Sequence, residues 1–243
     1  MCTVSYVPLK NGYILTSNRD ENPDRKTKLP SKMQLNNGEI IYSPIDVLKG
    51  GSWIATDEQG RTACLLNGAF LKHKPNPTYR KSRGQIVLDS FEANDFKNYA
   101  LTVILENIEP FTLLLIEPDH IQKLVWDGTK KHISDLPTKT PYLWSSATLY
   151  TADEHAKKEN YFLEELKGKD SNVDLMLHIH GKNEITPFIF SHSTVQTVSI
   201  TQVICNERQT SLNYILKNNT NETTDSLSLN CSSLLGQVTE HNK

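Results

Sequence analysis

The sequence of 243 residues predicts a layered α+β domain made mostly of antiparallel sheets. Candidate strands come first along the chain, and groups of helices and strands then follow in turn. This order lacks the regular strand–helix alternation of a doubly wound parallel sheet. Tight turn signals between neighbouring strands favour hairpins, which pair their strands antiparallel. We expect one domain over residues 1–216, followed at 217–243 by a polar tail rich in Asn, Ser and Thr, a composition that favours disorder.

The chain opens with a predicted β-hairpin. Apolar and polar residues alternate over residues 2–7, an Asn-Gly pair at 11–12 supplies a turn, and residues 13–17 run back. Asn and Gly both tolerate a positive φ, so this dipeptide is a strong hairpin signal. The polar cluster Asn-Arg-Asp-Glu follows at 18–21. Because the two strands are antiparallel, we expect this cluster to lie close to the start of the chain.

Hydrophobic periodicity and turn residues indicate the remaining elements. Pro23 and Pro30 predict a loop after the first hairpin. The helix at 153–166 is predicted from apolar residues that recur along one helical face. We expect strands at 52–56, 62–66, 111–117, 122–126, 195–205 and 211–216, and helices at 84–91, 93–99, 153–166 and 173–180.

Composition excludes several classes of protein. The formal net charge is −2, whereas a nucleic-acid or anionic-membrane partner would favour a basic face. There is no apolar run of about eighteen residues, as a transmembrane helix requires, and the first apolar stretch is too broken for a secretory signal. We therefore expect a cytoplasmic protein with a small-molecule substrate or ligand. The sequence leaves the oligomeric state open.

The cysteines and histidines give no metal-site pattern. The four cysteines have no CxxC spacing, and a reducing compartment would keep them as free thiols. His178 and His180 are two residues apart in a predicted helix, so they point to different faces and cannot chelate a metal together. We expect neither a metal nor a cofactor.

Cys2 is a candidate nucleophile because of its position. Removal of Met1 would leave Cys2 with both a thiol and a free α-amino group. The thiolate can attack a carbonyl, and the amine, with a pKa near ~8, can serve as the base. The alternative is that Cys2 is a small residue that simply packs on the hairpin.

Three further residues could complete a site. Arg19 would lower the pKa of the Cys2 thiol, and Asp20 could hold the α-amino group by a charge-assisted hydrogen bond. Asn67 ends an apolar strand, where its amide could stabilise an oxyanion. The alternatives are a solvated charge cluster at 18–21 and a simple Asn-Gly turn at 67–68.

Four motifs in this order resemble the NRDE family, also called the transport and Golgi organisation protein 2 family. The motifs are MCTVSYVP at the start, TSNRDENP at 16–23, GGSWIAT at 50–56 and GRTACLLN at 60–67. The resemblance is specific over roughly the first 90 residues. More distantly, Cys2, Arg19, Asp20 and Asn67 resemble the site of choloylglycine hydrolases and penicillin V acylases. That likeness implies a four-layer αββα fold of the N-terminal-nucleophile hydrolases and cleavage of linear amide C–N bonds.

The resemblance also suggests substrate-binding residues. Asn18 and Trp53 lie within its motifs, and Ser146 stands where those hydrolases have an asparagine. By residue type alone, Trp53 is more typical of a core position. The basic stretch at 72–83 is interpreted as a solvated loop, or as the border of a pocket for an acidic substrate.

Two functions therefore stay open. The first is an N-terminal-nucleophile amidohydrolase, with Cys2 as nucleophile after removal of Met1. The second is a non-catalytic binding or trafficking protein for a small hydrophobic ligand, such as haem or an acyl lipid, on the same fold. The enzyme needs a free Cys2 and an aimed oxyanion donor, whereas the carrier needs only a pocket.

Overall fold

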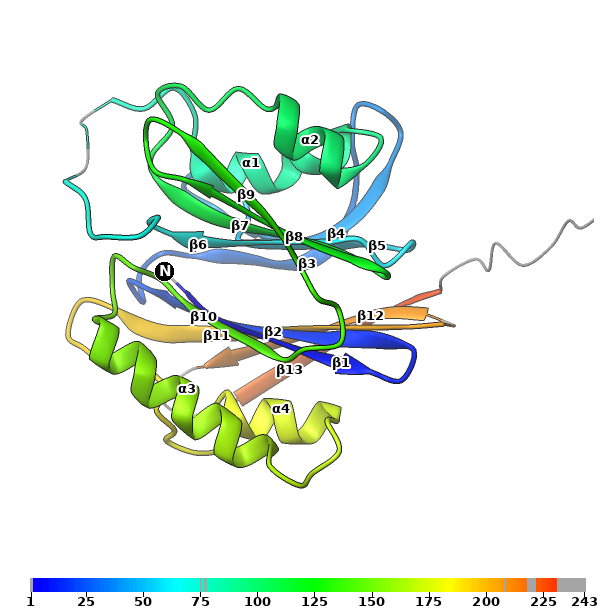
Figure 1. Cartoon of the computed structure of the whole chain (residues 1–243), viewed down its shortest axis with the longest axis vertical. Helices are drawn as coiled ribbons and strands as arrows, with labels where there is room; N and C mark the ends of the chain where they lie inside the picture. The colour runs from blue at the N-terminus through cyan, green and yellow to red at the C-terminus, as the bar shows by residue number, and fades with distance from the viewer. Residues whose placement is uncertain (1, 75, 77, 208, 218–221, 231–243) are drawn as a thin grey trace, which may run out of the picture.

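Two antiparallel sheets lie face to face in the computed structural model, and helices cover their outer faces (Figure 1). The structure describes residues 2–74, 76, 78–207, 209–217 and 222–230. Helices α1 and α2 cover one sheet, and α3 and α4 cover the other. The α+β class and the four-layer αββα arrangement are confirmed. The helices are α1 Arg83–Asp89, α2 Phe96–Thr102, α3 Ala152–Leu166 and α4 Val173–Ile179, with a 3-10 turn at Ser90–Glu92.

Every neighbouring pair of strands is antiparallel. Sheet A has the order β10-β1-β2-β11-β12-β13, and sheet B has the order β3-β4-β5-β6-β7-β8-β9. Sheet A contains β1 Cys2–Leu9, β2 Gly12–Glu21, β10 Tyr142–Ser145, β11 Gln196–Asn206, β12 Gln209–Lys217 and β13 Glu222–Asn230. Sheet B contains β3 Thr27–Gln34, β4 Ile40–Asp46, β5 Ile54–Asp57, β6 Thr62–Asn67, β7 Phe111–Glu117, β8 His120–Trp126 and β9 Lys131–Leu136.

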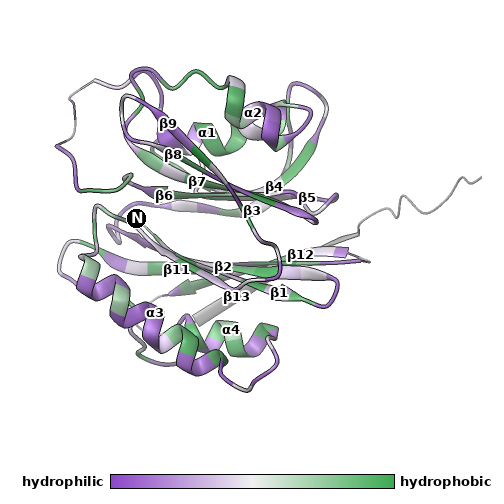
Figure 2. Ribbon diagram, viewed as in Figure 1, coloured by the Kyte–Doolittle hydropathy of each residue, from purple (hydrophilic) through white to green (hydrophobic). Residues whose placement is uncertain are grey.

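Apolar side chains fill the three spaces between the four layers. Phe91 belongs to the cluster between sheet B and its helices, and Tyr13 and Leu114 belong to the cluster between the sheets. Ile14 and Phe162 meet between sheet A and its helices. Figure 2 shows apolar residues along the strands, while α3 is mostly hydrophilic on its outer side. Burial of this apolar surface is the main force that holds the layers together.

The opening hairpin forms where the sequence predicts it, but its two turn residues are Lys10 and Asn11, and Gly12 already begins β2. Cys2 lies opposite Arg19, and Leu9 lies opposite Gly12 at the turn. Gly12 has a φ of 124°, and a Cβ added there would stand 2.0 Å from the carbonyl oxygen of Cys205. Only glycine fits this position, because β11 pairs with β2 as far as the turn and Asn206 lies opposite Gly12.

Several strands depart from the sequence-based expectation. The segment with Pro30, predicted as a loop, forms β3 at the edge of sheet B, where a proline need not donate to the ladder. The register shifts between Lys28 and Ser31, around that proline. Strands β4, β9 and β10 were not predicted, because their short runs gave too little periodicity.

The C-terminal segment was expected to lack order, but the structure describes a strand within it. Residues 222–230 form β13, which pairs with β12 from Lys217↔Glu222 to Gln209↔Asn230. Backbone pairing with an otherwise open edge explains why a polar segment can be ordered there. The rest of the expected tail, residues 218–221 and 231–243, lies outside the described residues.

None of the helices in the described part of the chain has the length and apolar character of a membrane span.

Candidate active site around Cys2

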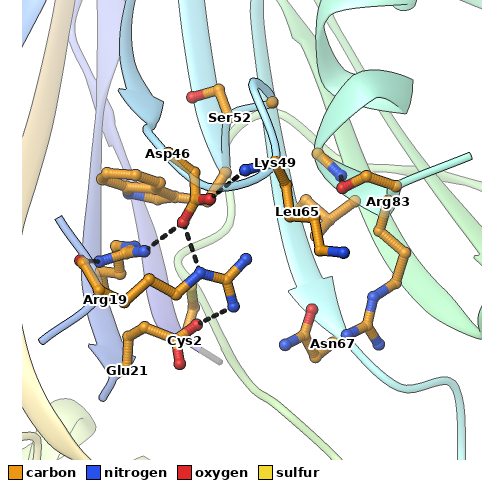
Figure 3. Close-up of a pocket in the computed structure, with 14 residues that line it drawn as sticks. Cys2, Arg19, Glu21, Asp46, Lys49, Ser52, Leu65, Asn67 and Arg83 are labelled. Atoms are coloured by element: carbon orange, nitrogen blue, oxygen red, sulfur yellow. Dashed lines mark hydrogen bonds and ion pairs between the residues drawn. The ribbon is translucent and has the colours of Figure 1, made fainter. Parts of the chain in front are cut away.

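A cavity of about 90 Å³ lies beside Cys2, where β1 and β2 of sheet A face β4, β6 and the start of α1 (Figure 3). It combines the thiol of Cys2 with a high density of charge. Its lining consists of Cys2, Arg19, Glu21, Arg25, Asp46, Lys49, Gly51, Ser52, Trp53, Leu65, Asn67, Ser82, Arg83 and Gly84. Cys2 and Asn67 are far apart in sequence, and packing of the two sheets brings them to one cavity.

Cys2 is the first described residue of β1, and it is 2% exposed. Its carbonyl oxygen accepts a hydrogen bond of 3.0 Å from the backbone N–H of Ser146, which fixes the end of the strand. Burial raises the pKa of the Cys2 thiol, and Arg19 lowers that pKa by less. Arg19 thus acts in the expected direction, but desolvation of the buried thiolate outweighs the nearby guanidinium.

Arg19 is held by a carboxylate that the sequence analysis did not identify. Its Nη2 donates to Asp46 Oδ2 at 2.8 Å, and Arg25 Nε donates to the same oxygen at 2.7 Å. The Arg19 guanidinium also lies 4.5 Å from the centre of the Trp53 ring. Burial acts to raise the pKa of Asp46, but hydrogen bonds from Arg25 and Lys49, with the charge of Arg19, hold it below its usual value. Asp46 thus fixes Arg19 at the wall of the cavity.

Asn18 and Asp20 lie on the opposite face of β2 from Arg19, because neighbouring residues of a strand point to opposite faces. Both are fully buried under the helices of sheet A. Asn18 donates to the carbonyls of His180 and Phe188, each at 3.0 Å. It does not line the cavity, so the structure gives no support to its expected contact with substrate.

Asp20 is held in a buried network behind the cavity. Tyr150 and Thr197 each donate a hydroxyl to its carboxylate at 2.7 Å. Burial raises the pKa of Asp20, while these two hydrogen bonds and the charge of Lys158 lower it by less. Lys158 Nζ in turn donates to Thr3 Oγ1 at 2.7 Å and lies 3.2 Å from the centre of the Tyr150 ring. A solvated cluster at 18–21 is therefore the wrong interpretation for Arg19 and Asp20.

Asn67 and Ser146 meet at the edge of the cavity but differ in role. Asn67 lines the cavity, and its side-chain amide has no hydrogen-bond partner among the described residues. Figure 3 shows Asn67 and Arg83 across the cavity from Arg19 and Asp46. Ser146 is 1% exposed, and its hydroxyl donates to the Asn67 backbone carbonyl at 2.6 Å. The Ser146 hydroxyl is thus engaged in holding Asn67, and it does not line the cavity.

Trp53 lines the cavity although it is only 6% exposed. Its indole Nε1 is buried without a hydrogen-bond partner among the described residues. A buried N–H of this kind normally has an acceptor, so a bound oxygen atom would satisfy it.

Comparison with known proteins adds a family and a fold. Residues 1–230 match the model of the family described as Transport and Golgi organisation 2. The chain belongs to this family. A search of the curated proteins finds no significant match.

Solved structures with the same fold include two hydrolases. A conjugated bile acid hydrolase from Clostridium perfringens, in a mutant form, aligns with a TM-score of 0.60 at 8% identity, over 98% of this chain and 100% of that one. A Caenorhabditis elegans ortholog of N-acylethanolamine-hydrolyzing acid amidase aligns with a TM-score of 0.58 at 11% identity, over 84% of this chain and 92% of that one. At such low identity the likeness establishes the N-terminal-nucleophile hydrolase fold and nothing further.

Arg83 lines the cavity, although the sequence analysis did not single it out. It belongs to the basic stretch at 72–83, which was interpreted as a solvated loop or as the border of a pocket. A Cβ on Gly51 would stand 2.5 Å from the carbonyl carbon of Gly84, so only glycine allows this close approach. Ser52 N then donates to Gly84 O at 3.0 Å, and the start of α1 is held against the cavity. Arg83 pairs with Glu109 at 3.1 Å.

Asp46 gave no sequence signal, because a single carboxylate at a strand end is common.

The described residues contain no group of three or more potential metal-ligating side chains. His180 is buried and contacts Ser5 Oγ at 2.7 Å and Asn18 Oδ1 at 2.6 Å. His178 lies 3.5 Å from Glu184 near the surface. The two histidines have separate partners.

Arg19→Ala is expected to lower the free energy of unfolding by about 1–3 kcal/mol, because Asp46 would lose its buried charged donor and keep only the partly exposed Arg25. Urea denaturation of this variant beside Lys10→Ala, an exposed control on the first turn, measures the effect. Equal midpoints for Arg19→Ala and the parent would show that the pair with Asp46 does not stabilise the fold.

Proposed function

We propose that the chain is an N-terminal-nucleophile hydrolase that cleaves a linear amide bond of a small molecule, with Cys2 as the nucleophile after removal of Met1. The observation that carries this proposal is the presence of the Cys2 thiol and the unpartnered Asn67 amide in one cavity. Membership of the family and the shared hydrolase fold support it. A reducing, cytoplasmic setting belongs to the proposal, because a thiol nucleophile must stay reduced.

The proposed reaction has two halves. In the first, the thiol proton passes to the Cys2 α-amine, and the thiolate adds to the amide carbonyl carbon. The Asn67 N–H donates to the developing oxyanion. The C–N bond then breaks, the leaving amine takes the proton, and a thioester remains on Cys2. In the second half, water attacks the thioester with the α-amine as base, which releases a carboxylic acid and restores the thiol.

Asp20 and Arg19 would have supporting roles. Cys2 lies opposite Arg19, and Asp20 follows it in β2, so Asp20 is beside the start of β1. We assign Asp20 to positioning the α-amine and Arg19 to the cavity wall, where it opposes the rise in the thiol pKa. The Trp53 indole N–H would bind a substrate oxygen.

The charges of the cavity favour an anionic substrate. Four basic residues line it, Arg19, Arg25, Lys49 and Arg83, against the two acidic residues Glu21 and Asp46. The volume of about 90 Å³ suits the scissile amide and a small charged group rather than a whole bulky molecule. A carboxylate near the cleaved bond would complement this lining.

Intact mass spectrometry tests the proposal directly. Purified protein that lacks Met1 should gain one acyl group from an activated acyl ester or a chromogenic acyl amide, and the adduct should map to Cys2. Cys2→Ala should form no adduct, whereas the matched control Cys64→Ala, which removes a neighbouring buried thiol outside the cavity lining, should still form it. Retention of Met1, or equal labelling of Cys2→Ala, would contradict the mechanism. A folded parent that never forms an adduct would favour the binding-protein alternative.

A further inference from the structure

A second cavity, much larger than the one beside Cys2, lies along the outer edge of β10. Its volume is about 610 Å³, within the range of about 300–1,000 Å³ typical of small-molecule sites. The two cavities have no lining residue in common. The second one, called here the β10 cavity, is bounded by β10 and residues 69–72 and 147–152, and by parts of β7, β8 and α3.

The wall of the β10 cavity is mainly apolar. Leu66 and Val125 are buried, and Trp144 forms another side. Phe70 and Leu71 continue this surface outward, and they are 59% and 80% exposed. A ligand that covers these exposed apolar side chains would remove apolar surface from water, and this burial would favour binding.

The charged groups that line the β10 cavity are basic. Lys72 and Lys123 both line it, and its lining contains no Asp or Glu. Lys123 is two residues from Val125 in β8, so the two side chains point to the same face of the strand. Among the described residues, no hydrogen bond or ion pair is found for either ammonium group. An anionic group would complement both lysines.

Two buried polar atoms in the lining also lack partners. Ser145 Oγ and His155 Nδ1 are buried, and neither has a hydrogen-bond partner among the described residues. Buried polar atoms are normally hydrogen-bonded, so each such atom calls for an explanation. Polar atoms of a bound ligand would satisfy them.

We propose that the β10 cavity is a binding site for a fatty-acid-like amphiphile, whose aliphatic chain lies on the apolar wall and whose carboxylate binds at Lys72 and Lys123. This site is distinct from the Cys2 cavity and does not depend on the proposed hydrolysis. Size, apolar lining, unpaired lysines and unsatisfied polar atoms all favour the same class of ligand.

Isothermal titration calorimetry with dodecanoate, below its micelle concentration, tests the proposal on the full chain. We expect saturable binding of dodecanoate, and binding at least about 10-fold weaker for dodecylammonium, which has the same chain with the opposite charge. The double charge reversal Lys72→Glu and Lys123→Glu should weaken dodecanoate binding by at least about 10-fold and remove the preference for the anion. The matched control Lys10→Glu with Lys97→Glu, at exposed positions outside the lining, should leave affinity within about 2-fold.

The location of the ligand is tested separately. A dodecanoate that carries a photoreactive diazirine should label peptides from residues 66–72 or 144–155. Cys2→Ala should bind dodecanoate as the parent does, which separates this site from the proposed catalytic one. Absence of saturable binding, equal affinity for the two amphiphiles, or loss of binding in Cys2→Ala would each overturn the proposal.

Discussion

Asn67→Ala is expected to slow amide hydrolysis, and acylation of Cys2, by about 10²–10³-fold, which is the usual cost of removing one oxyanion donor. Asn67 lines the cavity with Cys2, and its amide is not used by other described residues. Its backbone is fixed by the hydrogen bond from Ser146 Oγ to Asn67 O. The amide N–H is therefore available for charge that develops in the transition state. Single-turnover acylation by an activated ester, followed by intact mass, measures the rate even when turnover is slow.

Ser146→Ala provides the matched comparison. Its hydroxyl donates to a backbone carbonyl and does not line the cavity, so we expect a loss of about 10-fold or less. The effect would come from a less fixed Asn67 rather than from a lost oxyanion donor. Equal acylation rates for Asn67→Ala and the parent would end the oxyanion assignment. A larger loss in Ser146→Ala than in Asn67→Ala would show that the loop at 146, and not the Asn67 amide, carries the effect.

Lys158 is expected to make the stability of the fold depend strongly on pH. It is 3% exposed, and burial lowers its pKa to about 7, although the charges of Asp20 and Glu154 act to raise it. An unfolded lysine has a pKa of about 10.4, so between these values the unfolded state binds more protons than the folded state. The free energy of unfolding should therefore rise with pH, by about 1.4 kcal/mol per unit at most. This contribution is complete above the unfolded pKa and is lost as pH falls towards the folded pKa.

Urea denaturation of the parent and Lys158→Met isolates this contribution. The parent should gain about 2–3 kcal/mol over Lys158→Met between about pH 7.5 and 9.5, because methionine has no proton to release. Lys157→Met, an exposed neighbour on α3, should follow the parent. Other groups that titrate in this range are shared by all three proteins and cancel in the comparison. Parallel pH curves for the parent and Lys158→Met would show that Lys158 has an ordinary pKa in the fold.

The opening hairpin could be predicted because its information is local. The Asn-Gly pair at 11–12 and the alternation on either side predict the hairpin and bring residues 18–21 near Cys2. The register itself follows from a turn at Lys10 and Asn11, which places Cys2 opposite Arg19. Strands β5 to β8 and the four helices were predicted near their observed positions for the same reason. Strands β3 and β10 were missed, because pairing at a sheet edge stabilises short segments with weak intrinsic signals.

The residues that form the candidate site could be predicted only in part from the sequence. Of the residues that the motifs indicated, Cys2, Arg19, Trp53 and Asn67 line one cavity, whereas Asn18, Asp20 and Ser146 do not. Alternation along β2 alone implies that Arg19 points to one face of the sheet and that Asn18 and Asp20 point to the other. Which face meets the cavity depends on how sheet A packs on sheet B, and that contact joins residues distant in sequence.

The sequence by itself determined the fold class, the hairpin that brings Cys2 beside Arg19, and the motifs of the family. Only the tertiary structure decided that Asp46 binds Arg19 and that Ser146 holds Asn67. It also decided that burial raises the pKa of the Cys2 thiol. The physical reason is the difference in sequence separation between the interacting residues. Turn geometry and side-chain alternation act over a few neighbouring residues, whereas desolvation and charge pairing depend on which distant segments close over a group.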